Sequence, residues 1–297
     1  MFQQSRRTLI VPFIAPQFVL YTIFVFVPLA ATIFYGFTDW QGHGRPWNWS
    51  GLQNYRILWE DTNFHKAARN AAFLMVIGGV IVFVPALFLA WTLQQSIRFH
   101  RFFQFVILSP LVIAASVAGL MWKWMYNPTQ GLINPTLQSI GLGDLARPWL
   151  GDPQFALTAI IIASVWHGLG SWVLLISAGI DQIPSDLPDA ARTDGSSDWQ
   201  VFRFITMPLL WEILRILLVL WIIQALQAFT FIFVMTGPYG VGGPLGSTEV
   251  MGTYVYKMSF TDFKWGYGAG LATSMLVGIF ILSVLVNRVT FRERVEY

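Results

Sequence analysis

The chain has 297 residues, of which 55% are hydrophobic and only 11% are charged, and its formal net charge is +3. An average soluble domain carries roughly 25% charged residues, so this composition excludes a soluble globule and indicates a membrane protein. Because the sequence contains no cysteine, it also excludes disulfides, thiolate metal sites and a cysteine nucleophile.

Six apolar stretches are long enough to cross a bilayer, which takes roughly 20 apolar residues in a helix. The first follows Arg6 and Arg7, but it exceeds the roughly 7 to 15 apolar residues of a secretory signal, so we interpret it as a retained helix. The predicted spans are residues 9–37, 71–93, 102–122, 155–180, 209–235 and 265–286. The predicted fold is therefore an all-α polytopic membrane protein with six transmembrane helices.

The distribution of Lys and Arg predicts the orientation of these spans. With six spans, both termini lie on one side of the membrane. The stretches on that side, 1–8, 95–101, 181–207 and 287–297, carry nine Lys or Arg in 53 residues. The opposite stretches, 38–70, 124–154 and 236–264, carry seven in 93. Because positive charges concentrate in cytoplasmic loops, the N- and C-termini are predicted to be cytoplasmic.

The spans hold almost no ionisable group that could power transport. A carrier driven by an ion gradient keeps such groups inside the membrane, and here only His167 lies near the middle of a span, where a packing role is the simpler reading. The phosphate-binding, zinc and nucleophile motifs of known enzymes do not occur either. We therefore expect a non-catalytic chain, with no metal site, whose energy comes from elsewhere.

One predicted cytoplasmic loop, residues 184–208, carries the signals of two short helices. Ser185 or Asp186 can cap the first helix. Ser197, with Gln200 three residues later, forms a capping box for the second. The alternative reading is a solvated connector with ordinary caps.

Small residues mark the end of the first of these helices. Gly195 permits the left-handed conformation that ends a helix, while Ala190 and Ala191 leave a face that another protein can approach closely. Three apolar residues at near-helical spacing are expected to pack against the ends of the spans: Trp199, Phe202 and Ile205. Three charged residues are expected to face outward: Asp189, Arg192 and Asp194.

The same loop resembles the signature of permease subunits of bacterial binding-protein-dependent ABC importers, often written Glu-Ala-Ala-x3-Gly. Here the signature reads Asp189-Ala-Ala-x-x-Asp194-Gly195, followed by Phe202, Ile205 and Pro208, with Asp in place of the usual Glu. Other residues resemble the first permease of the maltose-type, carbohydrate-uptake branch: Gly51, Asn54, Tyr55, Asn70, Pro110, Gly119, Trp122, Tyr126, Gly131, Asn134, Gly243, Ser247, Thr248, Tyr254, Tyr256 and Phe260. The resemblance covers residues 10 to 290.

The resemblance implies a sugar importer of the cytoplasmic (inner) membrane of bacteria. Residues 1–297 would form one permease domain, with a core at about 67–288 and the loop 184–208 as its coupling helices. The implied partners are a second permease subunit in a heterodimer, two ATPase subunits and an extracytoplasmic substrate-binding protein, with no nucleic acid. ATP and Mg²⁺ would bind the ATPase, and this chain would bind no cofactor. The implied coupling residues are Asp189, Ala190, Ala191, Asp194, Gly195, Phe202 and Pro208.

A sugar path needs uncharged polar partners and aromatic faces. Four residues of the fourth span share one helical face by their spacing: Ser164, His167, Gly168 and Ser171. Gln224 and Gln227 share a face of the fifth span. The resemblance implies that sugar contacts residues of these two spans. Alternatively, the side chains are hydrogen bonds between helices, and the substrate site lies in the partner subunit.

Other functions require features that the sequence does not supply. The glycine-rich outer stretch 236–262 lacks the Lys-Ser/Thr ending of a phosphate loop and is predicted, with residues 54–70, to dock the binding protein. Import of another solute, such as glycerol phosphate, favours a cation on the path, where only Arg215 is available. A secondary carrier needs buried ion-coupling groups and a membrane enzyme needs buried catalytic groups, and the sequence shows neither. A non-transporting membrane scaffold would have no use for the kinked, partly polar spans that the sequence predicts.

Overall fold

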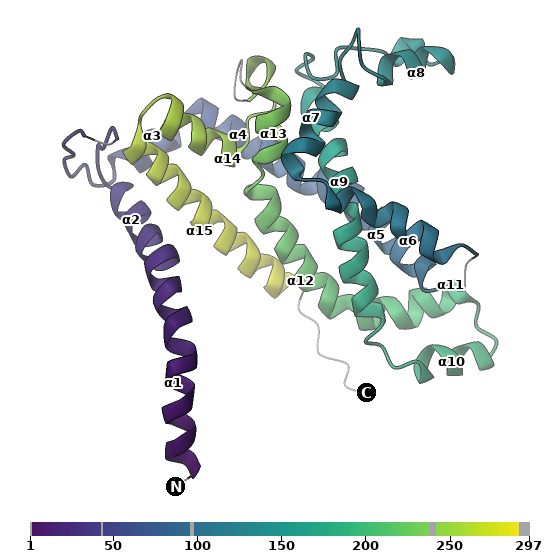
Figure 1. Ribbon diagram of the computed structural model, residues 1–297. Coiled ribbons are helices and arrows are strands. Elements are labelled where there is room, and N and C mark those ends of the chain that lie inside the picture. The colour runs from purple at the N-terminus through teal and green to yellow at the C-terminus, as the bar shows by residue number, and fades with distance from the viewer. Residues whose placement is uncertain (1, 43, 96–97, 238–241, 291–297) are drawn as a thin grey trace. The chain divides into compact units, whose positions relative to one another are not determined.

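The computed structural model describes residues 2–42, 44–95, 98–237 and 242–290, with side chains from residue 12 onward. Residues 238–241 of the glycine-rich outer stretch and residues 291–297 of the last basic stretch lie outside these ranges. Within the described ranges the regular secondary structure is helical, apart from a single bridge between Thr38 and Trp49 (Figure 1). The all-α prediction is confirmed.

The chain divides into two compact units. The first comprises Met1–Thr62 and Val255–Val277, and the second comprises Asn63–Tyr254 and Gly278–Tyr297. The last long helix, α15 (Trp265–Val289), begins in the first unit and ends in the second.

A long apolar helix opens the first unit. It runs through α1 (Phe2–Tyr21), a π-helical turn (Thr22–Phe26) and α2 (Val27–Tyr35). Its stretch Pro12–Tyr35 is long and apolar enough to cross a membrane, and none of it is buried inside the protein. This stretch agrees with the first predicted span. The unit also contains α3 (Gln53–Glu60) and a π-helical turn (Lys257–Thr261).

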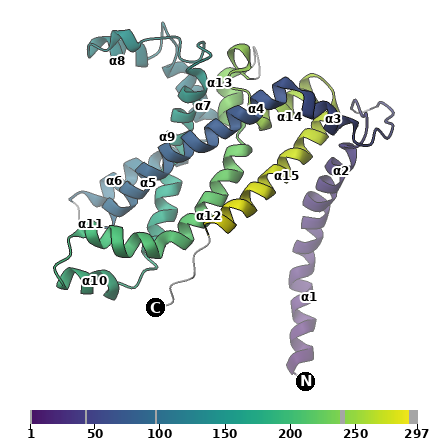
Figure 2. The same ribbon diagram turned by 180° about the vertical axis from the view of Figure 1, so that it is seen from behind.

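Two helices that cross closely form the core of the second unit. One runs through α4 (Thr62–Phe73), a π-helical turn (Leu74–Gly78) and α5 (Gly79–Leu93), and the other is α9 (Ala156–Ile180). Both views of the ribbon show α5 and α9 side by side (Figures 1 and 2). Alanines on both helices are almost fully buried, which lets the backbones approach: Ala86, Ala90, Ala156, Ala159 and Ala163.

The indole of Trp221 fills the space beside the π-helical turn of this unit. Trp221 belongs to α12 (Met207–Leu226), and its Nε1 donates a hydrogen bond of 2.8 Å to the Met75 carbonyl. A Cβ added to Gly79 would lie 2.8 Å from that Nε1, so only glycine fits there. The Met75 carbonyl also accepts a hydrogen bond from the N–H of Gly79, so the indole adds a second donor to that carbonyl and fixes α12 against the π-helical turn.

The third predicted span, residues 102–122, is not one straight helix. It consists of α6 (His100–Leu108), a 3₁₀ turn (Ser109–Val112) and α7 (Ala115–Met125), with a bend of 99°. Ile113 and Ala114 are extended at the break, with ψ of 131° and 137°. Pro110 just before them lacks an N–H and cannot continue the helical ladder. The described residues thus contain five helices able to cross a membrane, or six if this bent pair is one span.

The fifth predicted span, residues 209–235, is interrupted as well. α12 ends at Leu226, three residues follow that are not helical, and α13 (Thr230–Thr236) begins at Thr230. α13 packs on α7, where Gly119 meets the side chain of Val234. Nζ of Lys123 on α7 donates to the carbonyl of Gly237 at 3.1 Å. Residues near the two breaks therefore form one packed pair of short helices.

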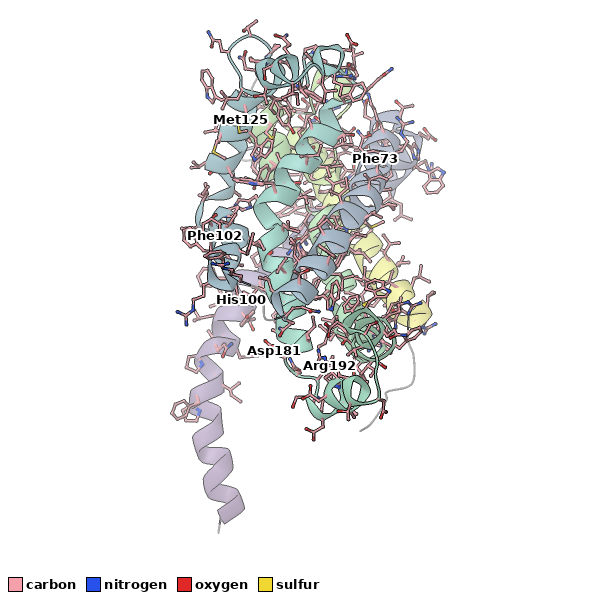
Figure 3. The ribbon with its side chains drawn as sticks, turned by 90° about the vertical axis from the view of Figure 1, so that its right-hand side faces the viewer. Phe73, His100, Phe102, Met125, Asp181 and Arg192 are labelled. Atoms are coloured by element: carbon pink, nitrogen blue, oxygen red, sulfur yellow. The ribbon has the colours of Figure 1, made fainter. Side chains whose placement is uncertain are left out.

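Shorter helices complete the second unit. They are α8 (Ile133–Ser139), α10 (Asp186–Thr193) and α11 (Asp198–Val201), with 3₁₀ turns at Gly143–Leu145 and Pro244–Gly246. α14 (Met251–Tyr256) begins in the second unit and ends in the first. A π-helical turn (Phe202–Thr206) joins α11 to α12 without a break. Met125 lies at one end of this unit, and Asp181 and Arg192 lie at the other (Figure 3).

Candidate functional site

The loop 184–208 forms two short helices at one end of the second unit, as its capping signals predict. Each residue of the first helix, α10, is exposed or half-buried, and none is fully buried. The second, α11, begins at a complete capping box. Gln200 Oε1 accepts a hydrogen bond of 2.7 Å from the Ser197 N–H, and the Ser197 hydroxyl accepts one from the Gln200 N–H.

The start of α10 differs from its prediction. Ser185 occupies the N-cap position, but its side chain makes no capping hydrogen bond. Its backbone is already helical, with φ −60° and ψ −26°, whereas an N-cap residue that accepts from the helix has an extended backbone. Asp186 lies inside the helix. The first turn of α10 therefore depends on its acidic residues near the helix N-terminus and not on a side-chain cap.

The end of α10 follows the prediction for glycine. Gly195 has a φ of +89°, and its N–H donates to the Arg192 carbonyl at 3.0 Å. The N–H of Ser196 donates to the Ala191 carbonyl at 3.0 Å. A Cβ added to Gly195 would meet no atom within 4 Å. Its backbone conformation therefore disfavours other residues, while the space above it is open.

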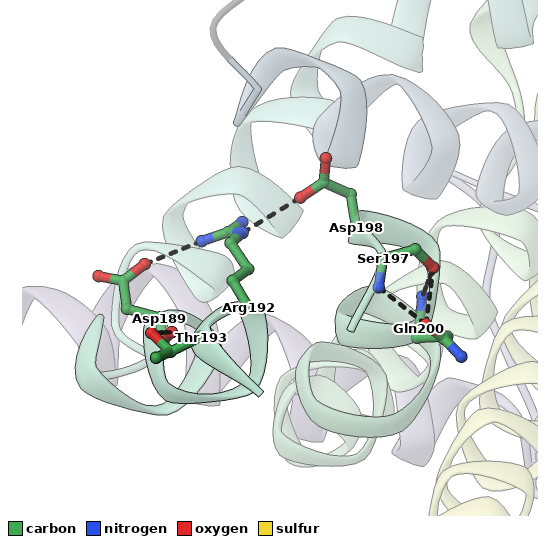
Figure 4. A network of polar contacts seen from close by, with 6 residues as sticks. All are labelled: Asp189, Arg192, Thr193, Ser197, Asp198 and Gln200. Atoms are coloured by element: carbon green, nitrogen blue, oxygen red, sulfur yellow. Dashed lines mark hydrogen bonds and ion pairs between the residues drawn. The ribbon is translucent and has the colours of Figure 1, made fainter. Parts of the chain in front are cut away.

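Arg192 joins the two helices of the loop (Figure 4). Its Nη1 lies 2.9 Å from Asp189 Oδ1 on α10, and its Nε lies 3.1 Å from Asp198 Oδ1 on α11. Asp189 is thus already engaged within the chain. Asp194, by contrast, is exposed, and its carboxylate makes no hydrogen bond or ion pair with the described residues. Neither pair was predicted from the sequence, although the i,i+3 spacing of Asp189 and Arg192 is a signal that could have found the first.

The apolar side of the loop packs against the end of α5. Phe202 is buried, and its ring lies 5.1 Å from that of Trp91, while the Trp199 ring lies 5.6 Å from Trp91. Ile205 is half-buried. The prediction that Trp199 and Phe202 pack on a span end is confirmed, and Trp91 is the partner that sequence reasoning missed. Ala190 and Pro208 are exposed.

The polar face predicted on α9 exists, and its residues are half-buried: Ser164, His167, Gly168 and Ser171. The two serine hydroxyls bind their own helix. Ser164 Oγ donates to the Ile161 carbonyl at 2.9 Å, and Ser171 Oγ donates to the Gly168 carbonyl at 2.6 Å. A Cβ added to Gly168 would meet no atom within 4 Å, so this face is open beside Gly168.

His167 bonds across to the broken third span. Its Nε2 lies 2.8 Å from the Ile113 carbonyl oxygen, and its ring centroid lies 5.4 Å from that of Phe231. Because a carbonyl oxygen only accepts, this geometry assigns the proton to Nε2. His167 therefore has the packing role that the sequence favoured over a proton relay, and it satisfies a carbonyl that the break leaves free.

The two glutamines predicted on the path lie at the end of α12. Gln224 and Gln227 are exposed, and neither side chain makes a hydrogen bond with the described part of the chain. The structure thus brings Ser164, His167, Gly168 and Ser171 together on one helix. Gln224 belongs to a different helix, α12, and Gln227 is the residue directly after that helix ends.

Three buried asparagines hold loops within the two units, Asn54 in the first and Asn70 and Asn134 in the second. Asn54 Nδ2 donates to the Gly36 and Thr38 carbonyls at 2.9 and 2.8 Å. Asn70 Nδ2 donates to the carbonyls of Glu249 at 2.9 Å and Ser247 at 3.1 Å. Asn134 Oδ1 accepts from Trp149 Nε1 at 2.8 Å. The asparagines that carry the family resemblance are therefore loop clamps, a role that the sequence pattern did not assign.

The fold has several helices that can cross a membrane. It also has an exposed pair of short helices, α10 and α11, at one end of its second unit. Both features are consistent with a multi-pass membrane permease. Residues 4–295 match the binding-protein-dependent transport system inner membrane components, and the chain belongs to this family. It is a permease subunit of an ABC transporter.

Individual relatives span nearly the whole chain. The chain is 34% identical over 273 residues to a probable ABC transporter permease protein of Pyrococcus horikoshii, covering 90% of each. It is 33% identical over 267 residues to the xylose/arabinose import permease protein XacH of Haloferax volcanii, covering 90% of this chain and 83% of the relative.

A solved structure has the same fold. It is a bacterial alginate ABC transporter in complex with an alginate pentasaccharide-bound periplasmic protein, and one of its chains superposes with a TM-score of 0.84 at 19% identity. The match covers 98% of this chain and 96% of that chain.

Proposed function

We propose that this chain is the membrane-spanning subunit of an ATP-driven importer, which carries a sugar or related polyol across the bacterial cytoplasmic membrane by alternating access. The observation that carries the proposal is the helical loop 184–208. It presents a small-residue, partly acidic helix to solvent, tied by Arg192 to a second helix that continues into α12. Such an element fits a chain that lacks a phosphate-binding loop and must receive its energy from a partner.

Sugar as the substrate class rests on the relatives and on the chemistry of the α9 face. One relative is named for import of xylose and arabinose, and the matching solved transporter imports alginate. The face formed by Ser164, His167, Gly168 and Ser171 is polar but uncharged, which suits hydroxyl groups. Gln224 and Gln227 add exposed amides at the end of α12. A phosphorylated solute is less well served, because the α9 face carries no cationic side chain.

The proposed assembly contains two permeases, two ATPase subunits and a substrate-binding protein outside the membrane. Residues 1–297 would act as one permease domain with both termini in the cytoplasm. ATP and Mg²⁺ would bind the ATPase subunits, and this chain would hold no cofactor. The alginate transporter, which has a periplasmic protein bound, supports the binding-protein partner. The family description supports the same partner.

Within the loop, we assign different roles to the proposed coupling residues. Asp194, Ala190 and Gly195 are exposed and would touch the ATPase directly. Asp189 is exposed too, but its pairing with Arg192 gives it the role of fixing α10 against α11. Three residues complete the set: Ala191 flanks the contact face, Phe202 anchors the loop, and Pro208 opens α12.

Co-purification tests this function with a matched pair of variants. Gly195 and Gly141 both have positive φ, +89° and +79°, and a Cβ at either would meet no atom within 4 Å. Gly195→Trp and Gly141→Trp therefore impose a similar backbone strain at different places. We expect Gly195→Trp and Asp194→Lys to lose the co-expressed ATPase subunit while keeping the second permease, and Gly141→Trp to keep both. ATPase retention in Gly195→Trp, or its absence from the wild type, would contradict the function.

A further inference from the structure

Three aromatic rings from two separate helices contact one another at the end of the second unit that carries Arg192. Trp91 lies in the last turn of α5, Trp199 lies in α11, and Phe202 follows in the π-helical turn. The ring centroids of Trp91 and Trp199 are 5.6 Å apart, those of Trp91 and Phe202 are 5.1 Å apart, and those of Trp199 and Phe202 are 5.6 Å apart. Each ring thus contacts both others, and we call the three residues the aromatic triad.

The triad is a contact that the chain connectivity does not require. The loop 184–208 follows α9 and leads into α12, so those two helices move with it through the backbone. α5 is separated from the loop by almost a hundred residues. Besides packing along α9, it reaches the loop region through the triad and, one turn further on, through Gln94, whose Nε2 donates to Asp181 Oδ1 at 2.8 Å.

Polar contacts extend this connection to α10. Arg192 bonds Asp189 on α10 and Asp198 at the start of α11, and Trp199 is the next residue after Asp198. A displacement of α10 therefore reaches Trp199 through one guanidinium and one peptide bond. From Trp199 it reaches α5 through ring contacts of a kind that prefer defined geometries.

We propose that the aromatic triad transmits the displacement of α10 and α11 to α5, which makes Trp91 and Trp199 positioning residues for alternating access. The inference rests on the proposed function, because it takes α10 and α11 as the element that the ATPase moves. It adds a third membrane helix to those that the loop drives. Packed contacts of this type shift between discrete arrangements, which is how small movements are passed on.

Trp199 is the member of the triad that can be removed with the least effect on folding. Its side chain is 57% exposed, whereas Phe202 is 7% exposed and Val201 beside it is 3% exposed. Trp199→Ala therefore deletes two ring contacts and leaves the buried part of the loop in place. Phe204, two residues beyond Phe202 and 71% exposed, lies outside the triad and provides a matched aromatic control.

The experiment compares hydrogen–deuterium exchange in the assembled complex with and without trapping by Mg²⁺, ATP and orthovanadate. Variants are Trp199→Ala, Trp91→Ala, Trp199→Phe and the control Phe204→Ala. In the wild type, trapping should change exchange in two segments, 186–201 and 88–95, by at least about fivefold, the lower end of coupling between sites. In Trp199→Ala and in Trp91→Ala, the change in 186–201 should persist and the change in 88–95 should be lost.

Trp199→Phe keeps an aromatic ring and should restore the response of 88–95 in part, and Phe204→Ala should respond as the wild type does. A response of 88–95 that survives in Trp199→Ala, or that is missing from the wild type, overturns the inference alone. Loss of the ATPase subunit from the Trp199→Ala complex also counts against the inference, because the triad would then be needed for the loop to fold and not for transmission to α5. If the wild type binds no ATPase subunit, the proposed function fails together with the inference.

Discussion

His167 Nε2 lies 2.8 Å from the carbonyl oxygen of Ile113, at the point where α6 and α7 meet at an angle of 99°. In an apolar medium a free carbonyl costs several kcal/mol, so a break in a membrane helix needs a partner from elsewhere. α9 is continuous through this region and supplies that partner. His167, the one histidine within the six predicted spans, therefore stabilises the break in the third span.

His167→Phe should destabilise the protein, because it keeps the ring contact with Phe231 and leaves the Ile113 carbonyl unpaired. We expect a loss of about 1 to 2 kcal/mol in the free energy of unfolding, the range of interhelical hydrogen bonds in membranes. Thermal unfolding in detergent measures it. Ser171→Ala is the control, since its hydroxyl binds a carbonyl of its own helix. Equal stability of His167→Phe and the wild type would show that water or lipid headgroups satisfy Ile113.

The sequence predicted the segments that cross the membrane better than it predicted their continuity. Hydropathy responds to apolar side chains, so the stretches 155–180 and 265–286 agree with α9 and α15 within a few residues. It does not register backbone geometry. The break after Pro110 and the one after Leu226 lie in sequence as apolar as the helices around them. Only the proline pointed to the first, and no comparable residue marked the second.

The candidate site was predictable where short-range rules apply and not where distant residues meet. The capping box of Ser197 and Gln200 and the positive φ of Gly195 follow from neighbours in the chain. The contact between Trp91 and Phe202 joins residues more than a hundred positions apart, and one sequence contains no signal for such a pair. The clamp of Asn70 on Ser247 and Glu249 was missed for the same reason.

Gly79→Ala should destabilise the second unit because the new Cβ would lie 2.8 Å from Nε1 of Trp221. Overpacking of this kind costs about 1 to 3 kcal/mol, and it also threatens the hydrogen bond to Met75. Gly278→Ala is the matched control, because it lies in α15 with no atom within 4 Å of the added Cβ. There the helix propensity of alanine should stabilise by up to about 1 kcal/mol. Unfolding midpoints in detergent that move in the same direction for both variants would refute the close contact.

Asp39 should make its loop sensitive to acid. Hydrogen bonds from the backbone and side chain of Asn48 lower the pKa of Asp39 below its ordinary value of 3.8. A carboxylate with a lowered pKa contributes its stabilisation above the unfolded pKa, and the contribution disappears as the pH falls through the folded pKa. Exchange of the Asn48 amide, corrected for its intrinsic rate, should therefore accelerate below pH 3.8. Asp39→Asn should exchange faster at neutral pH and lose the acid-dependent step. An identical step in that variant would assign it to another group.

Asn70→Ala should loosen the segment 246–249 without unfolding the second unit. The Asn70 amide donates to the carbonyls of Ser247 and Glu249, and the alanine would leave both without this donor. Hydrogen exchange across 246–249 should rise by about tenfold, the equivalent of a lost hydrogen-bond contribution of roughly 1.4 kcal/mol. Asn134→Ala should leave 246–249 unchanged, since Asn134 binds Trp149 in another loop.

Arg192→Lys should have little effect on stability and a larger one on the geometry of the loop. The guanidinium reaches Asp189 through Nη1 and Asp198 through Nε, and a single ammonium cannot reproduce that fork. Because all three side chains are about half exposed or more, the free energy of unfolding should fall by less than about 1 kcal/mol. The ATPase subunit should nevertheless bind more weakly, measured by titration of the purified ATPase onto the permease pair in nanodiscs. Asp198→Asn removes charge from the α11 side only and should weaken binding in the same direction. Unchanged affinity in both variants would mean that α10 keeps its position without Arg192, and that the backbone turn at Gly195 alone fixes the two helices.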